Sequence, residues 1–325
     1  MFAYILRRLL YAVPILIGVN LLTFALFFVV NTPDDMARLQ LGVKHVTPEA
    51  IERWKVEHGY DKPLLLNAEA KGAARFTDTI FFRHSAAMLA FEFGKGDDGR
   101  DIANEIRTRM GPSLAIALPV LVIGLMVNIT FALLMVFFRA TYLDLWGVVL
   151  CVVLMSISGL FYIIAGQYFI AKLWNLLPIS GFAGGIDSFR FILLPVLVSV
   201  VAGIGSGSRW YRTIFLEEIG RDYVRTARAK GLSEVRVLFR HVLKNGMIPI
   251  LTGVVVVLPL LFMGSLITES FFGIPGLGSY TIDAIQAQDF AVVRAMVFLG
   301  SFLYIVGLIL TDISYSWVDP RVRLQ

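Results

Sequence analysis

Six long stretches of this sequence contain no aspartate, glutamate, lysine or arginine, and they limit the possible fold more than any other feature. They cover residues 9–30, 112–138, 145–171, 191–208, 245–268 and 295–311. A helix needs about 20 apolar residues to cross a hydrocarbon core about 30 Å thick, and four of the stretches exceed that length. The other two reach it when flanking residues such as Arg209 and Asp312 snorkel or face protein. Because lipid offers no partner to an open sheet edge, these spans must be helices.

The sequence therefore predicts an all-α membrane protein with six transmembrane helices. Residues 1–30 would form the N-terminus and first helix, residues 31–111 a small insert, and residues 112–325 a five-helix core. Within the core we expect helices at 112–138, 145–171, 190–212, 245–268 and 295–317, with loops at 213–244 and 269–294. A hydrophobic fraction of 57% and a mean hydropathy of +0.75 exclude an ordinary soluble domain.

Lysine and arginine predict the orientation. With six spans, both termini lie on the same side as segments 139–144 and 209–247, which together carry most of the basic residues near span ends. Positive charge marks the cytoplasmic side, so we expect cytoplasmic N- and C-termini and an extracytoplasmic insert. Arg7 and Arg8 precede the first stretch as in a signal peptide. That stretch is longer than a signal core and no Ala-x-Ala-like site follows it, so we expect it to be retained.

The insert shows one clear local signal. Thr47 followed by Pro48 predicts the start of a helix, because threonine caps an N-terminus and proline suits the first turn. Gly59 is expected to end that helix. The insert therefore reads as a small lid-like addition rather than an autonomous domain.

Motifs for enzymatic chemistry are missing. Residues 94–96 lack the other parts of a phosphate-binding G-x-x-x-x-G-K-[ST] loop, so we expect no ATP hydrolysis by this chain. Four histidines and one cysteine, Cys151, form no metal-binding pattern. We expect no metal, no cofactor and no nucleic acid to bind this chain. Segments 60–61 and 94–97 imitate the paired motifs of intramembrane aspartyl proteases, but both lie in the polar insert rather than in a span.

Polar residues inside the predicted spans are candidates for a solute path. They are Asn128, Ser156, Ser158 and Gln167, together with the small-residue run at 203–208. Asn128 and Gln167 could equally bond across helices, and Gly203 with Gly207 favours close helix packing over a translocation surface. The absence of charge along the spans disfavours a proton- or sodium-coupled relay, although backbone carbonyls could still bind sodium.

The basic segment 209–247 is the strongest candidate for a functional surface. Helical spacing places Tyr223, Ala227 and Lys230 on one face. Asp222 suits the positive N-terminal end of such a helix. Small residues in this stretch would let another surface approach closely. Both a docking element and a solvated loop anchored by its positive charges fit the pattern.

Several motifs point in one direction when taken together. The basic segment reads Tyr223-x-x-Thr226-Ala227-Arg228-Ala229-Lys230-Gly231-Leu232, followed by His241-x-Leu243-x-Asn245. Residues 269–278 read Glu-Ser-Phe-Phe-Gly-Ile-Pro-Gly-Leu-Gly, and further short motifs lie at 6–9, 177–181, 289, 312–315 and 319–321. In combination they resemble the permease subunits of ATP-binding-cassette importers of the dipeptide, oligopeptide and nickel transport family. The long segment after the first span resembles the first permease of the pair, the dipeptide-type B subunit.

This resemblance implies a non-catalytic permease of the bacterial inner membrane that moves di- or oligopeptides. The implied partners are a second, homologous permease in a heterodimer, two cytoplasmic ATPase domains that bind ATP and Mg, an extracytoplasmic solute-binding protein, and membrane lipid. The ATPases would dock on the 222–232 helix. The residues that the resemblance assigns to this coupling are Asp222, Tyr223, Arg225, Thr226, Ala227, Lys230, Gly231, Leu232, His241 and Asn245.

Some departures from the family pattern leave the solute open. The general importer motif begins Glu-Ala-Ala, whereas residues 225–227 read Arg-Thr-Ala, as is common in the peptide branch. Residues 31–35 replace the usual Pro-Gly-Asp-Pro, and residues 64–100 fit the family poorly. Nickel chelates, oligosaccharides, opines and peptide-like antibiotics remain alternative solutes. An ion-coupled secondary transporter and a membrane scaffold remain alternative classes.

Overall fold

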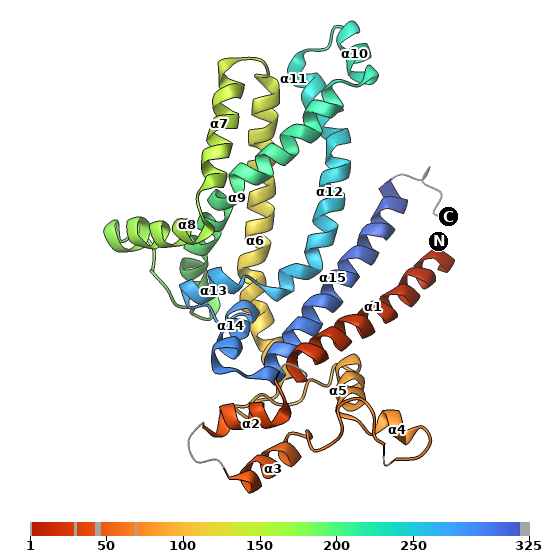
Figure 1. Cartoon of the computed structure of the whole chain (residues 1–325). Coiled ribbons are helices and arrows are strands. Elements are labelled where there is room, and N and C mark those ends of the chain that lie inside the picture. Colours follow the sequence, from red (N-terminus) through yellow and green to blue (C-terminus); the bar gives the residue numbers. More distant parts are fainter. Residues whose placement is uncertain (1, 29–30, 43–46, 69, 319–325) are drawn as a thin grey trace. The chain divides into compact units, whose positions relative to one another are not determined.

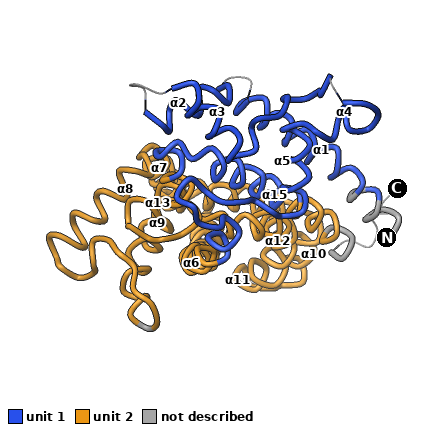
Figure 2. Tube along the Cα trace, turned by 90° about the horizontal axis from the view of Figure 1, so that it is seen from below, with its two compact units in different colours: residues 1–107, 284–305 blue, residues 108–283, 306–325 orange. Residues whose placement is uncertain are grey.

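A computed structural model describes residues 2–28, 31–42, 47–68 and 70–318. These residues form helices and no β-strand; the motif predicted at 319–321 lies outside the described residues. The chain divides into two compact units, residues 1–107 with 284–305 and residues 108–283 with 306–325 (Figure 2). Helices α6, α14 and α15 contribute residues to both units, so the units cut across the three segments predicted from the sequence.

The first unit combines the N-terminal helix with the insert and the start of the last helix. Its helices are α1 (Phe2–Phe28), α2 (Pro33–Leu41), α3 (Pro48–Glu57), α4 (Ala74–Thr77), α5 (Ile80–Leu89) and the first part of α15 (Phe290–Val318). The predicted start of α3 is confirmed, because the Thr47 side chain accepts a hydrogen bond from the Ala50 amide. Gly59 has a φ of +70° just after the helix, where glycine is favoured.

Aromatic side chains hold the insert on the helices of this unit. Phe28 stacks on Phe24 at a centroid distance of 4.6 Å and meets the Tyr60 ring edge-on at 5.1 Å. The guanidinium of Arg294 lies 5.3 Å from the centre of the Phe28 ring, and Nη2 of the same residue contacts Nδ1 of His84 at 3.4 Å. Burial, aided by the nearby Arg294 charge, lowers the pKa of His84 to about 3. His84 is therefore neutral near pH 7 and accepts from Arg294.

The second unit contains most of the remaining helices (Figure 1). They are α6 (Ile102–Phe137), α7 (Tyr142–Ser156), α8 (Gly159–Gly166), α9 (Ser188–Ile219), α10 (Asp222–Ala229), α11 (Glu234–Val237), α12 (Leu243–Leu260), α13 (Leu266–Phe272), α14 (Leu277–Ala287) and the end of α15. Helix α9 crosses α6 obliquely and contacts α12, with α10 and α11 at one end of these helices and α13 at the other. The predicted loops at 213–244 and 269–294 thus contain short helices.

Among the described residues, five helices are long and apolar enough to cross a membrane. The sixth predicted span, at 145–171, consists of two helices, α7 and α8 with its π-helical continuation, which are bent by 88°. The six spans expected from the sequence are reached when this bent pair counts as one. Ile157 and Ser158 have extended backbone at the bend. The Tyr162 hydroxyl donates to the Leu154 carbonyl at 2.8 Å, and this satisfies a backbone group at the end of α7.

Glycines allow the helices of this unit to cross at short range. A Cβ on Gly205 would lie 2.5 Å from the Cys151 carbonyl oxygen of α7, and a Cβ on Gly207 would lie 2.5 Å from the Asn128 amide of α6. The predicted close packing is therefore present at Gly207, whereas a Cβ on Gly203 would meet no atom within 4 Å. Helix α9 therefore contacts α7 through Gly205 and α6 through Gly207.

Gly205 and Gly203 give a matched test of the packing, because only the first lies against another helix. We expect Gly205→Ala to lower the melting temperature of the detergent-solubilised chain, because overpacking costs about 1–3 kcal/mol. Gly203→Ala carries the same gain in helix propensity but meets open space. It should leave the melting temperature equal or slightly higher. Equal melting curves for the two variants would contradict the helix crossing.

Candidate functional site

Helix α10 (Asp222–Ala229) occupies the segment where the sequence placed a docking helix. Arg221 has extended backbone at the N-cap position, and Asp222 lies in the first turn, where a negative charge is favourable. Gly231 follows the helix with a φ of +76°, a conformation that other residues adopt only with strain. The local sequence thus sets both ends of the helix.

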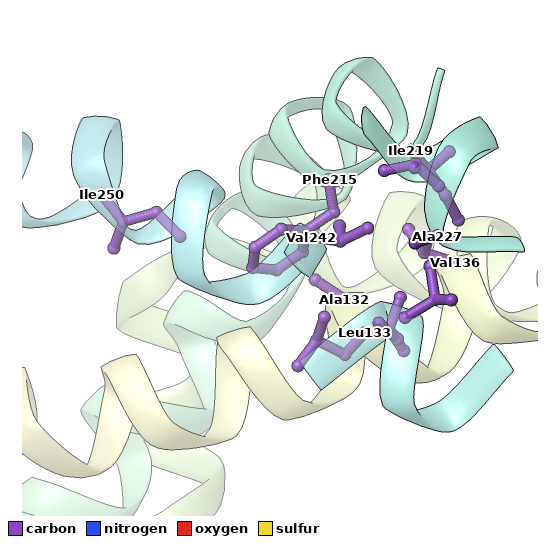
Figure 3. Packing of buried hydrophobic residues seen from close by; sticks show 11 residues of the cluster. Ala132, Leu133, Val136, Phe215, Ile219, Ala227, Val242 and Ile250 are labelled. Carbon is purple, nitrogen blue, oxygen red and sulfur yellow. The ribbon is translucent and has the colours of Figure 1, made fainter. Parts of the chain in front are cut away.

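One side of α10 packs into the interior of the chain (Figure 3). Val224 is fully buried and Ala227 is 4% exposed. They join a hydrophobic cluster, here called the coupling core, that consists of Ala132, Leu133, Val136, Phe215, Ile219, Val224, Ala227, Val237, Leu238, Val242 and Ile250. These residues come from α6, α9, α10, α11, α12 and the turn before α12. The coupling core therefore fixes α10 to the ends of three long helices.

The opposite side of α10 is open. Its exposed residues are Asp222, Arg225, Thr226, Ala229 and Lys230, and Gly231 beyond the helix is exposed as well. The face predicted from Tyr223, Ala227 and Lys230 is therefore divided, because Ala227 points inward and Lys230 outward. The Tyr223 hydroxyl is half-buried and donates to the Glu218 carboxylate. Burial and this hydrogen bond raise the pKa of Tyr223 to about 12.

Polar contacts tie the segment around α10 to its neighbours. Arg228 forms a two-pronged pair with Glu234, with Nε–Oε1 at 2.7 Å and Nη2–Oε2 at 3.2 Å. Glu234 also lies 4.0 Å from Arg139, in the loop after α6. The Asn245 amide donates to the His241 carbonyl at 3.0 Å. Leu232 packs against the coupling core, whereas His241, in the π-helical turn before α12, and Asn245, in α12, are half-buried outside α10.

A second ion pair in this region was not predicted. Arg212 of α9 binds Asp144 of α7 through Nε–Oδ1 at 2.9 Å and Nη2–Oδ2 at 2.7 Å. Both side chains are largely buried, so the pair is far less screened than a surface one. The sequence did show Asp144 as a single acidic residue beside the predicted span 145–171. Spacing alone could not identify Arg212 as its partner.

A cavity of about 650 Å³ lies between α6, α8, α9, α12 and α13. Of the predicted path residues, Ser158 lines this cavity. Asn128 instead lines a separate hollow of about 380 Å³ and accepts a hydrogen bond from Ser208 at 2.9 Å. Ser156 bonds back to the Val152 carbonyl. Gln167 donates to two backbone carbonyls, those of Ile179 and Phe271, at 3.1 and 3.0 Å.

The four predicted path residues are therefore not one site. Ser158 contributes to the cavity, whereas the other three make contacts within or between helices. The cavity is lined mainly by apolar side chains, with hydroxyls at Ser113, Ser199 and Thr268 among them. An apolar lining with a few polar groups is typical of pockets for small molecules.

Comparison with known proteins identifies the class. The family described as binding-protein-dependent transport system inner membrane component matches residues 113–324, and its N-terminal counterpart matches residues 1–89. The chain belongs to this family. The family supplies the membrane-spanning permease of ATP-binding-cassette importers, which is a transport subunit rather than a catalytic one.

Full-length relatives of this permease agree with the assignment. A putative peptide transport system permease protein of Brucella abortus is 31% identical over 329 residues, covering 99% of each chain. The dipeptide transport system permease protein DppB of Escherichia coli is 28% identical over 351 residues, with 99% of each chain covered. The oligopeptide transport system permease protein AppB of Bacillus subtilis is 26% identical, covering 99% of this chain and 100% of its own.

Two alanines of α10 distinguish its buried side from its open side. We expect Ala227→Glu to destabilise the permease by more than about 3 kcal/mol, because it places an unpaired charge in the coupling core. Ala229→Glu introduces the same side chain on the exposed side and should change stability by less than about 0.5 kcal/mol. Thermal unfolding of both detergent-solubilised variants measures the difference. Two variants of equal stability would show that Ala227 is not buried.

Proposed function

We propose that this permease moves di- or oligopeptides across the bacterial inner membrane as part of an ATP-driven importer. The observation that carries this proposal is full-length similarity to permeases named for peptide, dipeptide and oligopeptide transport. In this proposal the chain pairs with a second, homologous permease and receives solute from an extracytoplasmic binding protein. Two cytoplasmic ATPase domains bind ATP and Mg, and this chain hydrolyses no ATP itself.

The open side of α10 is the proposed contact for an ATPase domain. Asp222, Arg225, Thr226 and Lys230 are exposed on a helix whose other side is held by apolar packing. A partner can therefore bind this surface without unfolding the permease. Because the coupling core includes the ends of α6, α9 and α12, movement of α10 would displace all three helices together. The ion pair between Arg228 and Glu234 also joins α10 to α11, so the two short helices would move together.

The 650 Å³ cavity is the proposed part of the solute path within this chain. Helices α6, α9 and α12 line the cavity and also contribute to the coupling core. ATP binding and hydrolysis in the partner domains would shift the population between states in which the cavity opens to one side or to the other. In this proposal, movement of α10 reaches the cavity because α6, α9 and α12 both pack against α10 and line the cavity.

Charge reversal on α10 tests the docking surface. We expect Arg225→Glu combined with Lys230→Glu to abolish capture of the ATPase subunits from native membranes while the protein level stays unchanged. Both side chains are exposed, so the folded chain should tolerate the change. Arg190→Glu, another exposed basic position outside the α10 segment, is the matched control and should retain the ATPases. Full capture by the double variant would contradict the docking proposal.

Peptide transport is tested with the same variants, after the importer has been reconstituted into proteoliposomes. Proteoliposomes that contain the complete importer should take up a labelled tripeptide with ATP inside and not without it. The double variant should lose this uptake. Uptake that persists without ATPase subunits and collapses with an ionophore would instead indicate an ion-coupled secondary transporter.

A further inference from the structure

The side chain of Glu269, in α13, is buried with a relative exposure of 1%. Its Oε2 atom accepts from the amides of Gly278 at 2.7 Å and Ser279 at 3.1 Å, and its Oε1 atom accepts from the amide of Ser265 at 3.1 Å. The Ser113 hydroxyl, from α6, is a further hydrogen-bond partner. One carboxylate thus joins the start of α13, the start of α14 and α6.

Hydrogen bonds to Glu269 favour its ionised form, whereas burial is the larger effect and leaves its pKa above the usual value. Three of its partners are backbone amides, which can only donate, so they require acceptor oxygens. Burial raises the pKa of Glu269, and hydrogen bonds from Ser113 and the three amides oppose that shift. None of these partners is a lysine or an arginine. Among the described contacts, the carboxylate is therefore hydrogen-bonded but has no ion-pair partner.

Glycines fix the geometry around this carboxylate. A Cβ on Gly264 would lie 2.6 Å from the Ser113 hydroxyl, and one on Gly276 would lie 2.5 Å from the same atom. A Cβ on Gly278 would lie 2.5 Å from the Ser265 carbonyl. The backbone at Gly264 and Gly276 therefore approaches the Glu269 carboxylate and Ser113 so closely that neither position has room for a side chain.

Glu269 and Ser113 also belong to the wall of the 650 Å³ cavity. Among the described residues that line this cavity, Glu269 is the only one with an ionisable side chain. The remaining wall is apolar or carries hydroxyls. A fixed negative charge beside such a wall is weakly screened, so it attracts a cation and repels an anion inside the cavity.

We propose that Glu269 makes the cavity selective for solutes that carry an ammonium group. This proposal rests on the proposed peptide transport and narrows it to a preference for peptides that carry an additional ammonium group. Glu269 acts through its electrostatic field, because its acceptor positions are already occupied and no direct bond to the solute is available. It is thus a specificity-determining residue that discriminates during transit, after the binding protein has delivered the solute.

A matched pair of peptides measures this selectivity. Ala-Lys-Ala and the same tripeptide acetylated on the lysine side chain differ by one ammonium group, and both keep a free N-terminus. Uptake of each is measured in proteoliposomes with the complete importer and one unchanged binding protein. The selectivity ratio is the kcat/KM for Ala-Lys-Ala divided by the kcat/KM for the acetylated peptide. We expect Glu269→Gln to lower this ratio by about tenfold, which is the scale of one charge pair at moderate distance in a partly screened site.

Two further variants separate charge from structure. Ser113→Ala removes one hydrogen bond to the carboxylate but keeps the carboxyl group and its three amide donors, so measured at a pH where Glu269 stays ionised the ratio should remain at the wild-type value even where the overall rate falls. Ser199→Lys places a cation on the α9 wall of the cavity without touching Glu269, and the ratio should fall as in Glu269→Gln. This second variant keeps the proposal falsifiable when Glu269→Gln does not assemble, because an unchanged ratio would show that the transported peptide does not sense a charge in this cavity.

The outcomes distinguish the two proposals. An unchanged ratio in Ser199→Lys, and in Glu269→Gln where it assembles, would overturn the role of Glu269 while leaving peptide transport intact. No uptake of either tripeptide by the wild-type importer would instead contradict the proposed peptide function.

Discussion

A chain inside hydrocarbon must satisfy its own backbone hydrogen bonds, and the architecture of the second unit depends on this constraint. Where its helices are interrupted, side chains supply the missing partners. The Tyr162 hydroxyl bonds to the Leu154 carbonyl at the bend between α7 and α8, and the Gln167 amide bonds to the carbonyls of Ile179 and Phe271. Glu269 does the same for three amides around α13 and α14. The cavity lies beside these interruptions, because α8 and α13 both form part of its wall.

The end of this unit that carries α10 and α11 is held together mainly by the apolar side chains of the coupling core. There, apolar packing holds the short helices α10 and α11 in place, and the Arg228–Glu234 pair joins one to the other. Val224 and Ala227 are buried, while Arg225 and Lys230 remain exposed on the same two-turn helix. A helix of eight residues is too short to be stable alone in water. The core therefore accounts for both the existence of α10 and its fixed position on α6, α9 and α12.

Features that depend on local sequence were predictable, and features that depend on distant contacts were not. Charge-free stretches indicated the spans, and Thr47 with Pro48 indicated the start of α3, because hydropathy and capping act over short segments. The bend at Ile157 and Ser158 escaped prediction, since hydropathy continues through it without a charge or a proline. Spacing placed Ala227 and Lys230 on neighbouring turns but could not show that the coupling core covers only Ala227. Glu269 could not be paired with Ser113 because 156 positions, 269 minus 113, separate them in the chain.

The division of α10 into a buried side and an open side has a consequence for how importers of this kind diversify. In the proposed docking, residues on the buried side are constrained by packing within the permease, whereas residues on the open side are constrained only by the bound partner. Duplicated importers within one cell could therefore acquire separate, non-crossing sets of subunits through a few surface exchanges at positions 222, 225, 226, 229 and 230. Exchange of these positions between two permeases would offer a compact route to orthogonal transporters that leaves the solute path unchanged.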